Sequence, residues 1–149
     1  SEYKYRIEEQ RRLIQSLPVR YPVSFMDTEY TPDDFYSRIK GLEKEKEGGR
    51  RCEKCFRLRL EYAAKLAEEK GFDFFTTTLS ISPLKNAPLL NSIGTELAEI
   101  YHVPYLVSDF KKKNGYKRST ELSHEYGMYR QDYCGCVFSY RERHPEASV

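Results

Sequence analysis

Two segments of the chain carry apolar residues three and four positions apart, which is the spacing of one face of a helix. The first segment places on one face Phe56, Leu60, Ala63, Ala64 and Ala67. The second places on one face Leu89, Ile93, Leu97 and Ile100. The pattern therefore predicts two helices. Gly71 is expected to end the first, and Pro88 is expected to start the second.

Three further helices are predicted with weaker apolar faces. Residues 2–16 form a charged amphipathic pattern, and residues 119–126 form another near the C-terminus. Between them, Thr31 and Pro32 supply an N-cap and a first helical residue for a helix that runs to about Lys40.

Short apolar segments rich in β-branched and aromatic residues alternate with these helices at 21–26, 72–78 and 103–107. Strands separated by helices favour an α/β fold, in which a parallel sheet has helices on both faces. Ligands bind beyond the C-terminal ends of such strands. The pattern therefore points to the loops at 80–86 and 108–115 as the ligand-binding edge.

The chain has 149 residues, and neither an internal repeat nor a linker divides it. We therefore expect a single domain over residues 1–140 and a frayed tail over residues 141–149. No apolar stretch approaches the roughly 20 residues that span a bilayer, and no signal peptide is visible. The sequence predicts a cytoplasmic protein without a membrane partner.

The net charge of +2 is too small to indicate a polyanionic partner, but the basic residues are unevenly distributed. One group precedes the first cysteine pair and consists of Arg50 and Arg51. A second group leads toward the other pair and consists of Lys111, Lys112, Lys113, Lys117 and Arg118. Such runs form either a solvated face or an anion-binding surface, and their position near cysteines favours the second.

All four cysteines occur in close pairs, Cys52 with Cys55 and Cys134 with Cys136. Cytosolic thiols are kept reduced, so roles as metal ligands or redox groups gain weight over structural disulfides. The start of a helix favours thiolate at the first pair, which needs two further ligands to complete a four-ligand site. A four-cysteine zinc site and a thioredoxin-like dithiol are the alternatives there.

The second pair has one glycine between its cysteines, so a disulfide between them would be strained and easily exchanged. The same spacing also allows both sulfurs to bind one metal. Asp109 and Asp132 are candidates for a proton donor or a further metal ligand, although a helix cap or a surface ion pair is the commoner role. Aromatic residues near this pair could form core or stack on a base, namely Tyr129, Tyr133 and Phe138.

Four motifs in order resemble the cobalamin-independent epoxyqueuosine reductases. They are GGRRCEKCFRLRL at 48–60, TTTLSISP at 76–83, Asp109-Phe110, and YRQDYCGCVFS at 129–139. The resemblance implies a Rossmann-like domain of the nucleotide-hydrolase type and an iron-sulfur enzyme that completes queuosine synthesis on tRNA. It implies that the epoxide of epoxyqueuosine at the wobble position is reduced to the cyclopentene of queuosine and that the epoxide oxygen leaves as water.

The resemblance also implies roles for individual residues. Cys52 and Cys55 would be two ligands of a [4Fe-4S] cluster, and Cys134 with Cys136 would be the redox-active pair. A separate iron bound by cysteine and aspartate is implied, for which Asp109 is the candidate here. The partners would be tRNA carrying epoxyqueuosine and an electron donor that the sequence does not identify. Asp109 is also a substrate-binding candidate, and the candidates for contact with the anticodon phosphates are Lys111, Lys112, Lys113 and Arg118.

Members of that family begin with a strand that ends in adjacent cysteines, and these complete the cluster. This sequence contains neither, so half of the cluster ligands are absent. Either the sequence is truncated at the N-terminus, which the missing strand favours, or the cluster is lost and the protein as it stands is inactive. The alternative function is a four-cysteine zinc module that binds RNA without catalysis. A third is a thiol-disulfide oxidoreductase that acts on proteins.

Overall fold

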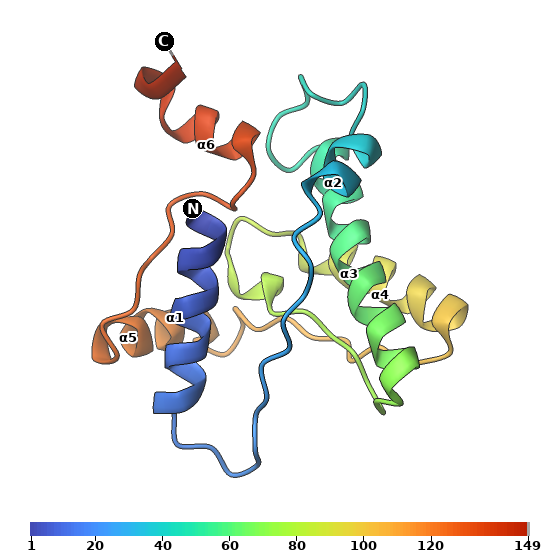
Figure 1. The fold of residues 1–149 in the computed structure, drawn as a ribbon, viewed down its shortest axis with the longest axis vertical. Coiled ribbons are helices and arrows are strands. Elements are labelled where there is room, and N and C mark those ends of the chain that lie inside the picture. Colours follow the sequence, from blue (N-terminus) through green and yellow to red (C-terminus); the bar gives the residue numbers. More distant parts are fainter. Residues whose placement is uncertain (149) are drawn as a thin grey trace. The chain divides into compact units, whose positions relative to one another are not determined.

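The computed structural model describes residues 1–148, so that Val149 of the predicted tail lies outside the described residues. Figure 1 shows a helical chain. Its α-helices are α1 (Glu2–Ser16), α2 (Pro32–Arg38), α3 (Arg50–Lys70), α4 (Ala87–Tyr101), α5 (Gly115–Glu125) and α6 (Val137–Arg143). Residues 1–148 also form two 3-10 helices, η1 (Leu79–Ile81) and η2 (Pro145–Ser148). The five predicted helices are confirmed, and α6 extends into the segment expected to be frayed.

The chain packs as two compact units. The central unit is continuous and runs from Thr31 to Lys117. The terminal unit combines residues 1–30 with the segment that begins at Arg118. The first cysteine pair therefore belongs to the central unit and the second pair to the terminal unit. Within the part of the chain that the structure covers, no helix is long and apolar enough to cross a membrane.

The core of the central unit lies between α3 and α4, which run side by side (Figure 1). Leu60 of α3 and Leu90 and Ile93 of α4 are at most 2% exposed. Each such side chain contributes about 1.5–3 kcal/mol by burial. Both helices have clear ends, because the side chain of Asn86 accepts the amide of Leu89 at the start of α4 and the left-handed Gly71 ends α3.

Gly94 of α4 allows the ring of Tyr105 to lie against the helix backbone. A Cβ atom at this position would lie 2.5 Å from the ring. The Tyr105 hydroxyl donates a hydrogen bond of 3.1 Å to the side chain of Asn91, one turn earlier on the same helix. The segment after α4 is thereby fixed along α4 by both an apolar and a polar contact.

The prediction of an α/β fold with a Rossmann-like parallel sheet is wrong for this structure, which has no strand among residues 1–148. Only an isolated parallel bridge forms, between Phe75 and Tyr105. The amide of Phe75 donates to the carbonyl of Pro104 at 3.1 Å, and the amide of Leu106 donates to the carbonyl of Phe75 at 2.9 Å.

Side chains, rather than backbone amides, make the next contacts along these two segments. The Thr76 hydroxyl donates to the carbonyl of Leu106 at 2.8 Å. The side chain of Asn91 donates to the carbonyl of Ser108 and accepts its amide, at 3.0 and 3.2 Å. Because the Ser108 amide binds the side chain of Asn91, it is not available for the next ladder hydrogen bond in this direction.

The third predicted strand, at 21–26, is also absent. This segment is irregular, and its apolar side chains are largely exposed: Tyr21 at 68%, Val23 at 53% and Met26 at 41%. An alternating strand pattern predicts a buried face, and this segment has none. Its composition alone therefore misled the prediction.

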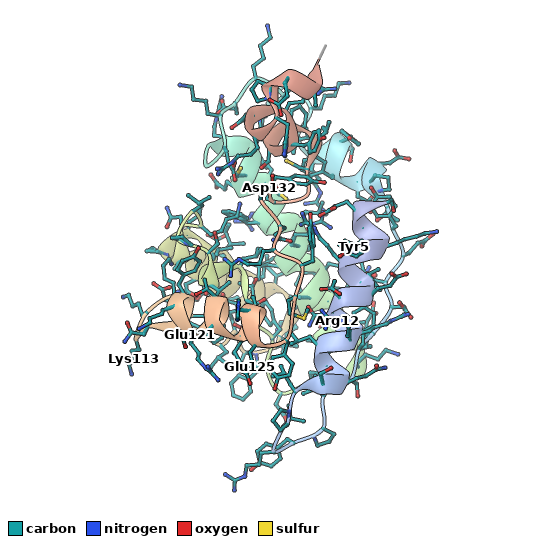
Figure 2. All side chains as sticks on the ribbon, turned by 90° about the vertical axis from the view of Figure 1, so that its left-hand side faces the viewer. Tyr5, Arg12, Lys113, Glu121, Glu125 and Asp132 are labelled. Carbon is teal, nitrogen blue, oxygen red and sulfur yellow. The ribbon has the colours of Figure 1, made fainter. Side chains whose placement is uncertain are left out.

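The terminal unit is held mainly by polar contacts, because neither α1 nor α5 contains a buried residue. Arg12 projects from α1 (Figure 2) and donates to the carbonyls of Tyr126 and Gly127 at 2.8 and 3.0 Å. Its neighbour Glu9 accepts the amide of Tyr129 at 2.7 Å. These contacts fasten the segment after α5 to α1.

Candidate functional site

Cys52 and Cys55 lie in the first two turns of α3, in the central unit. Cys52 is 8% exposed and belongs to the α3/α4 core, whereas Cys55 is partly exposed. The amide of Gly48 donates to the sulfur of Cys52 at 3.2 Å. Three-residue spacing on a helix places both side chains on neighbouring positions of one face. The pair can thus present two sulfurs to one metal centre.

Arg51 fixes the charged loop that precedes this pair. Its side chain is 2% exposed, and its guanidinium donates to the carbonyls of Glu43 and Glu45. Arg50 forms an ion pair of 3.0 Å with the side chain of Glu45. These two arginines were candidates for anion binding, but in the structure both hold the loop onto the start of α3.

A second contact closes the same region. Lys85, in the predicted ligand loop, lies 3.5 Å from the carboxylate of Glu47, and their side chains are only 11% and 18% exposed. The Lys85 amine also lies 5.7 Å from the centre of the Phe56 ring. The cysteine pair therefore lies beside a nearly buried ion pair, which the sequence did not reveal because its two members are far apart in the chain.

The predicted carboxylate ligand is engaged elsewhere. Asp109 forms an ion pair of 2.8 Å with Lys111. The hydrogen bond from Lys111 lowers the pKa of the Asp109 carboxyl, against a smaller opposing effect of burial. Two of the predicted substrate-binding residues therefore bind each other. Across residues 1–148, no three potential ligands from His, Cys, Asp and Glu gather around one point.

The other basic candidates are more accessible. Lys112 and Lys113 are exposed, and Lys113 has a left-handed backbone with φ of 51°. Figure 2 labels Lys113 at the tip of its turn. Arg118, on α5, lies 3.5 Å from Glu121 in an exposed ion pair. Lys112 and Lys113 are the candidates best placed to contact an anion directly.

Cys134 and Cys136 lie at the start of α6 in the terminal unit. Cys134 is exposed, Cys136 is partly buried, and neither cysteine forms a disulfide. Their sulfur atoms are 3.5 Å apart. Gly135 between them has φ of 110°, which side chains other than hydrogen rarely allow. The glycine thus permits the turn that brings the two thiols together.

Ser139 supports this turn from within α6, where it is 1% exposed. Its hydroxyl accepts the amide of Cys134 at 3.3 Å, and its amide donates to the sulfur of Cys136 at 3.4 Å. The hydrogen bond between the sulfurs and burial raise the pKa of the Cys136 thiol, and the Ser139 amide lowers it by less. In that sulfur–sulfur hydrogen bond Cys134 is the donor and Cys136 the acceptor, and the raised pKa favours the thiol form of Cys136 over the thiolate.

Arg6 of α1 supports the turn from the other side. Its guanidinium donates to the carbonyls of Tyr133 and Cys134, both at 3.0 Å, and to the carboxylate of Glu2 at 2.7 Å. Sequence reasoning missed this residue. The four-residue spacing of Glu2 and Arg6 signals a helix ion pair, but nothing in the sequence signals the contact with residues near the C-terminus.

Aromatic and charged side chains surround the second pair. The Tyr133 ring meets the Tyr140 ring edge-on, with 5.1 Å between the ring centroids. The Tyr140 ring stacks on the His144 ring, with 4.4 Å between the centroids. His144 in turn lies 2.8 Å from the carboxylate of Asp132. Asp132, a candidate proton donor, is therefore engaged by a histidine that the sequence placed in a frayed tail. The rings pack on one another and on α6.

Comparisons with known proteins point in one direction. The sequence model of the family described as "Epoxyqueuosine reductase QueH" matches residues 1–142. A Staphylococcus epidermidis protein named epoxyqueuosine reductase QueH is 44% identical over 143 residues, covering 93% of this chain and 60% of that protein. A Streptococcus pyogenes protein of the same name is 48% identical over 117 residues, covering 78% of this chain and 46% of that protein.

A third similar protein, from Thermotoga maritima and of the same name, is 39% identical over 147 residues. This match covers 95% of the chain and 77% of the relative. The chain thus spans about half the length of the staphylococcal and streptococcal proteins that it matches, at 60% and 46%, and more of the Thermotoga protein.

Proposed function

The chain belongs to the epoxyqueuosine reductase QueH family, and from this premise we propose that it acts in the reduction of epoxyqueuosine to queuosine in tRNA. The observation that carries the proposal is the pair of thiols of Cys134 and Cys136, which form no disulfide and whose sulfurs lie 3.5 Å apart. Removing the epoxide oxygen as water while leaving an alkene consumes two electrons and two protons. Two thiols that close to a disulfide release two of each.

The two thiols have different environments, which suits them to different parts of this step. Cys134 is exposed and accessible to a substrate. Cys136 is partly buried, and its pKa is raised by the hydrogen bond to the Cys134 sulfur and by burial. We infer that Cys134 contacts the substrate, while Cys136 retains a proton and later closes the disulfide with Cys134. The epoxide is reduced, the dithiol is oxidised, and the oxygen leaves as water.

Cys52 and Cys55 suit two ligand positions of a [4Fe-4S] cluster, because two adjacent sulfurs lie at a helix start and one already accepts a backbone amide. When bound, such a cluster would supply electrons singly. Arg51 and the Lys85–Glu47 pair would hold the surrounding loops in place.

Asp109 does not suit the role of an additional iron ligand as it stands. Its carboxylate is bound to Lys111 at 2.8 Å, so metal binding would first have to break an ion pair. We derive no step through a second iron. The exposed Lys112 and Lys113 are instead proposed to contact tRNA phosphates.

The test compares cysteine variants of the full-length protein, purified anaerobically. Iron, sulfide and zinc contents are measured, and conversion of epoxyqueuosine in tRNA is followed by nucleoside mass spectrometry. Cys134→Ser and Cys136→Ser should each lower turnover more than 100-fold and retain iron. Cys52→Ser should lose iron but still form the Cys134–Cys136 disulfide. Full turnover by either Cys134→Ser or Cys136→Ser would contradict the proposal.

Two other functions would give different results in the same experiment. A colourless protein with zinc, no iron and no effect on epoxyqueuosine would indicate a zinc module that binds RNA. A protein that reduces disulfides of other proteins after complete removal of iron, without converting epoxyqueuosine, would indicate a thiol-disulfide oxidoreductase.

A further inference from the structure

The peptide between Cys134 and Gly135 is held by a charged side chain from the other end of the sequence. Two nitrogens of the Arg6 guanidinium donate to the consecutive carbonyls of Tyr133 and Cys134 at 3.0 Å each. The third nitrogen donates to Glu2 at 2.7 Å, which fixes the orientation of the guanidinium plane. Hydrogen bonds from a charged donor are about twice as strong as neutral ones.

The guanidinium also occupies the space beside Gly135. A Cβ atom at this glycine would lie 3.0 Å from one Arg6 nitrogen. The peptide on this side of the turn is therefore confined by hydrogen bonds to its carbonyl and by the guanidinium that lies against it. The other side of the turn is confined by Ser139, which binds the Cys134 amide and the Cys136 sulfur.

Disulfide formation must disturb this arrangement. The two sulfurs are 3.5 Å apart, whereas a disulfide bond requires about 2.05 Å. Only one residue separates the cysteines, so closing the small ring rotates the peptides on either side of Gly135. The carbonyl of Cys134, which Arg6 holds, belongs to one of those peptides.

We propose that Arg6 is a positioning residue that stabilises the open dithiol form of the Cys134–Cys136 pair and thereby makes its disulfide easier to reduce. Interactions that stabilise a reduced dithiol raise its reduction potential. The proposal rests on the proposed function in assigning substrate electrons to this pair. A disulfide that is easily reduced can be returned to the dithiol by a weaker electron donor after each turnover.

Arg12 provides a matched control within the same helix. Like Arg6, it donates to two consecutive backbone carbonyls, those of Tyr126 and Gly127. Like Arg6, it is oriented by a glutamate of α1, here Glu9. It contacts neither cysteine, so it separates a general effect on the terminal unit from an effect on the thiol pair.

The experiment equilibrates Arg6→Ala, Arg12→Ala and the unchanged protein anaerobically with defined ratios of oxidised and reduced glutathione. Samples are quenched in acid, alkylated and digested with trypsin. The peptide from Gln131 to Arg141 contains both cysteines and no others, so its mass reports the fraction of disulfide. Oxidised glutathione accepts the two electrons and two protons that the dithiol loses and becomes two molecules of reduced glutathione.

We expect Arg6→Ala to raise the equilibrium constant for disulfide formation about tenfold, which corresponds to a potential about 30 mV lower for a two-electron couple. Arg12→Ala should change the constant less than twofold. An unchanged constant in Arg6→Ala, a shift in the opposite direction, or an equal shift in Arg12→Ala would overturn the proposal.

Glu2→Gln keeps the proposal testable if Arg6→Ala does not fold. This variant removes the carboxylate that orients Arg6, and we expect a shift of about threefold in the same direction. No shift in a folded Glu2→Gln protein, as judged by circular dichroism, would overturn the proposal when Arg6→Ala cannot be measured.

The glutathione equilibrium involves neither tRNA nor iron, so the two proposals can fail separately. If Arg6→Ala shifts the equilibrium but serine variants of the pair retain reductase activity, the proposed function is wrong and the role of Arg6 stands. If the serine variants are inactive and the Arg6→Ala equilibrium is unchanged, the role of Arg6 is wrong and the proposed function stands.

Discussion

The two units of the chain are stabilised in different ways, and each contains one cysteine pair. The central unit has a core of apolar side chains between α3 and α4, and Cys52 is part of that core. In the terminal unit, α1 and α5 bury no residue, and arginines of α1 bind backbone carbonyls of the segments that follow α5. A cysteine in a packed core keeps its position, which suits a metal ligand.

A pair that changes its covalent state, as we propose for Cys134 and Cys136, needs a different environment. Cys134 and Cys136 must approach each other to form a disulfide and separate again on reduction. Segments held by a few exposed hydrogen bonds open at lower free energy than segments within an apolar core. The polar support of the terminal unit therefore permits the movement that redox cycling requires, while Arg6 and Ser139 define one of its end points.

The comparison predicts that truncating an apolar side chain lowers the free energy of unfolding much more in the central unit than in α1 of the terminal unit. Leu60→Ala should lower the free energy of unfolding by about 2–5 kcal/mol, because it leaves a cavity in a close-packed core. Tyr5→Ala in α1, where the side chain is 46% exposed, should lower it by less than about 1 kcal/mol. Urea denaturation followed by circular dichroism measures both, and equal losses would remove the distinction between the units.

Overpacking of the core of the central unit should also be costly. Gly94→Ala places a methyl group 2.5 Å from the Tyr105 ring, so we expect a loss of about 1–3 kcal/mol in the free energy of unfolding. Ser92→Ala on the same helix introduces no such conflict and serves as the control. If Gly94→Ala were as stable as the unchanged protein, the close packing of Tyr105 on α4 would be wrong.

Removing an arginine of α1 should loosen only the terminal unit. Arg12→Ala loses two hydrogen bonds to backbone carbonyls, which should destabilise the segment that they hold. Hydrogen exchange should accelerate in the segment from Tyr126 to Tyr129 and stay unchanged in α3. Faster exchange in α3 would show that the two units do not open independently.

The smallest expected effect is a pH dependence in the central unit. The hydrogen bond from Lys111 lowers the pKa of Asp109 below the model-compound value of 3.8. A lowered pKa in the folded state contributes stability that is present above about pH 4 and is lost as the pH falls through the folded value. Lys111→Met should raise the pKa of Asp109 in an NMR titration, and Lys112→Met should leave it nearly unchanged. Equal shifts in both variants would contradict the ion pair.

Local patterns in the sequence predicted the helices well. The apolar spacing predicts both α3 and α4. Gly71 marks the end of α3, and Pro88 marks the start of α4 to within a few residues. The sheet was mispredicted because a ladder depends on which backbone groups remain free for pairing. Here the side chains of Thr76 and Asn91 bind the carbonyl and amide groups that the next contacts would have needed.

The same distinction applies to the candidate site. The spacing of the cysteine pairs is visible in the sequence, and the motifs around them identify the family. The supports of the pairs are not visible, because they join distant residues: Arg6 lies 128 positions from the Cys134 carbonyl that it binds. The contact of Arg51 was not visible either. A basic residue beside a cysteine suggests anion binding, whereas the Arg51 guanidinium binds a carbonyl of the preceding loop.

The most direct test is a single-turnover reaction of the fully reduced protein with epoxyqueuosine-containing tRNA in the absence of any external electron donor. The proposal predicts that each queuosine formed is accompanied by one disulfide in the peptide from Gln131 to Arg141. Queuosine that forms while Cys134 and Cys136 remain free thiols would show that the electrons come from elsewhere.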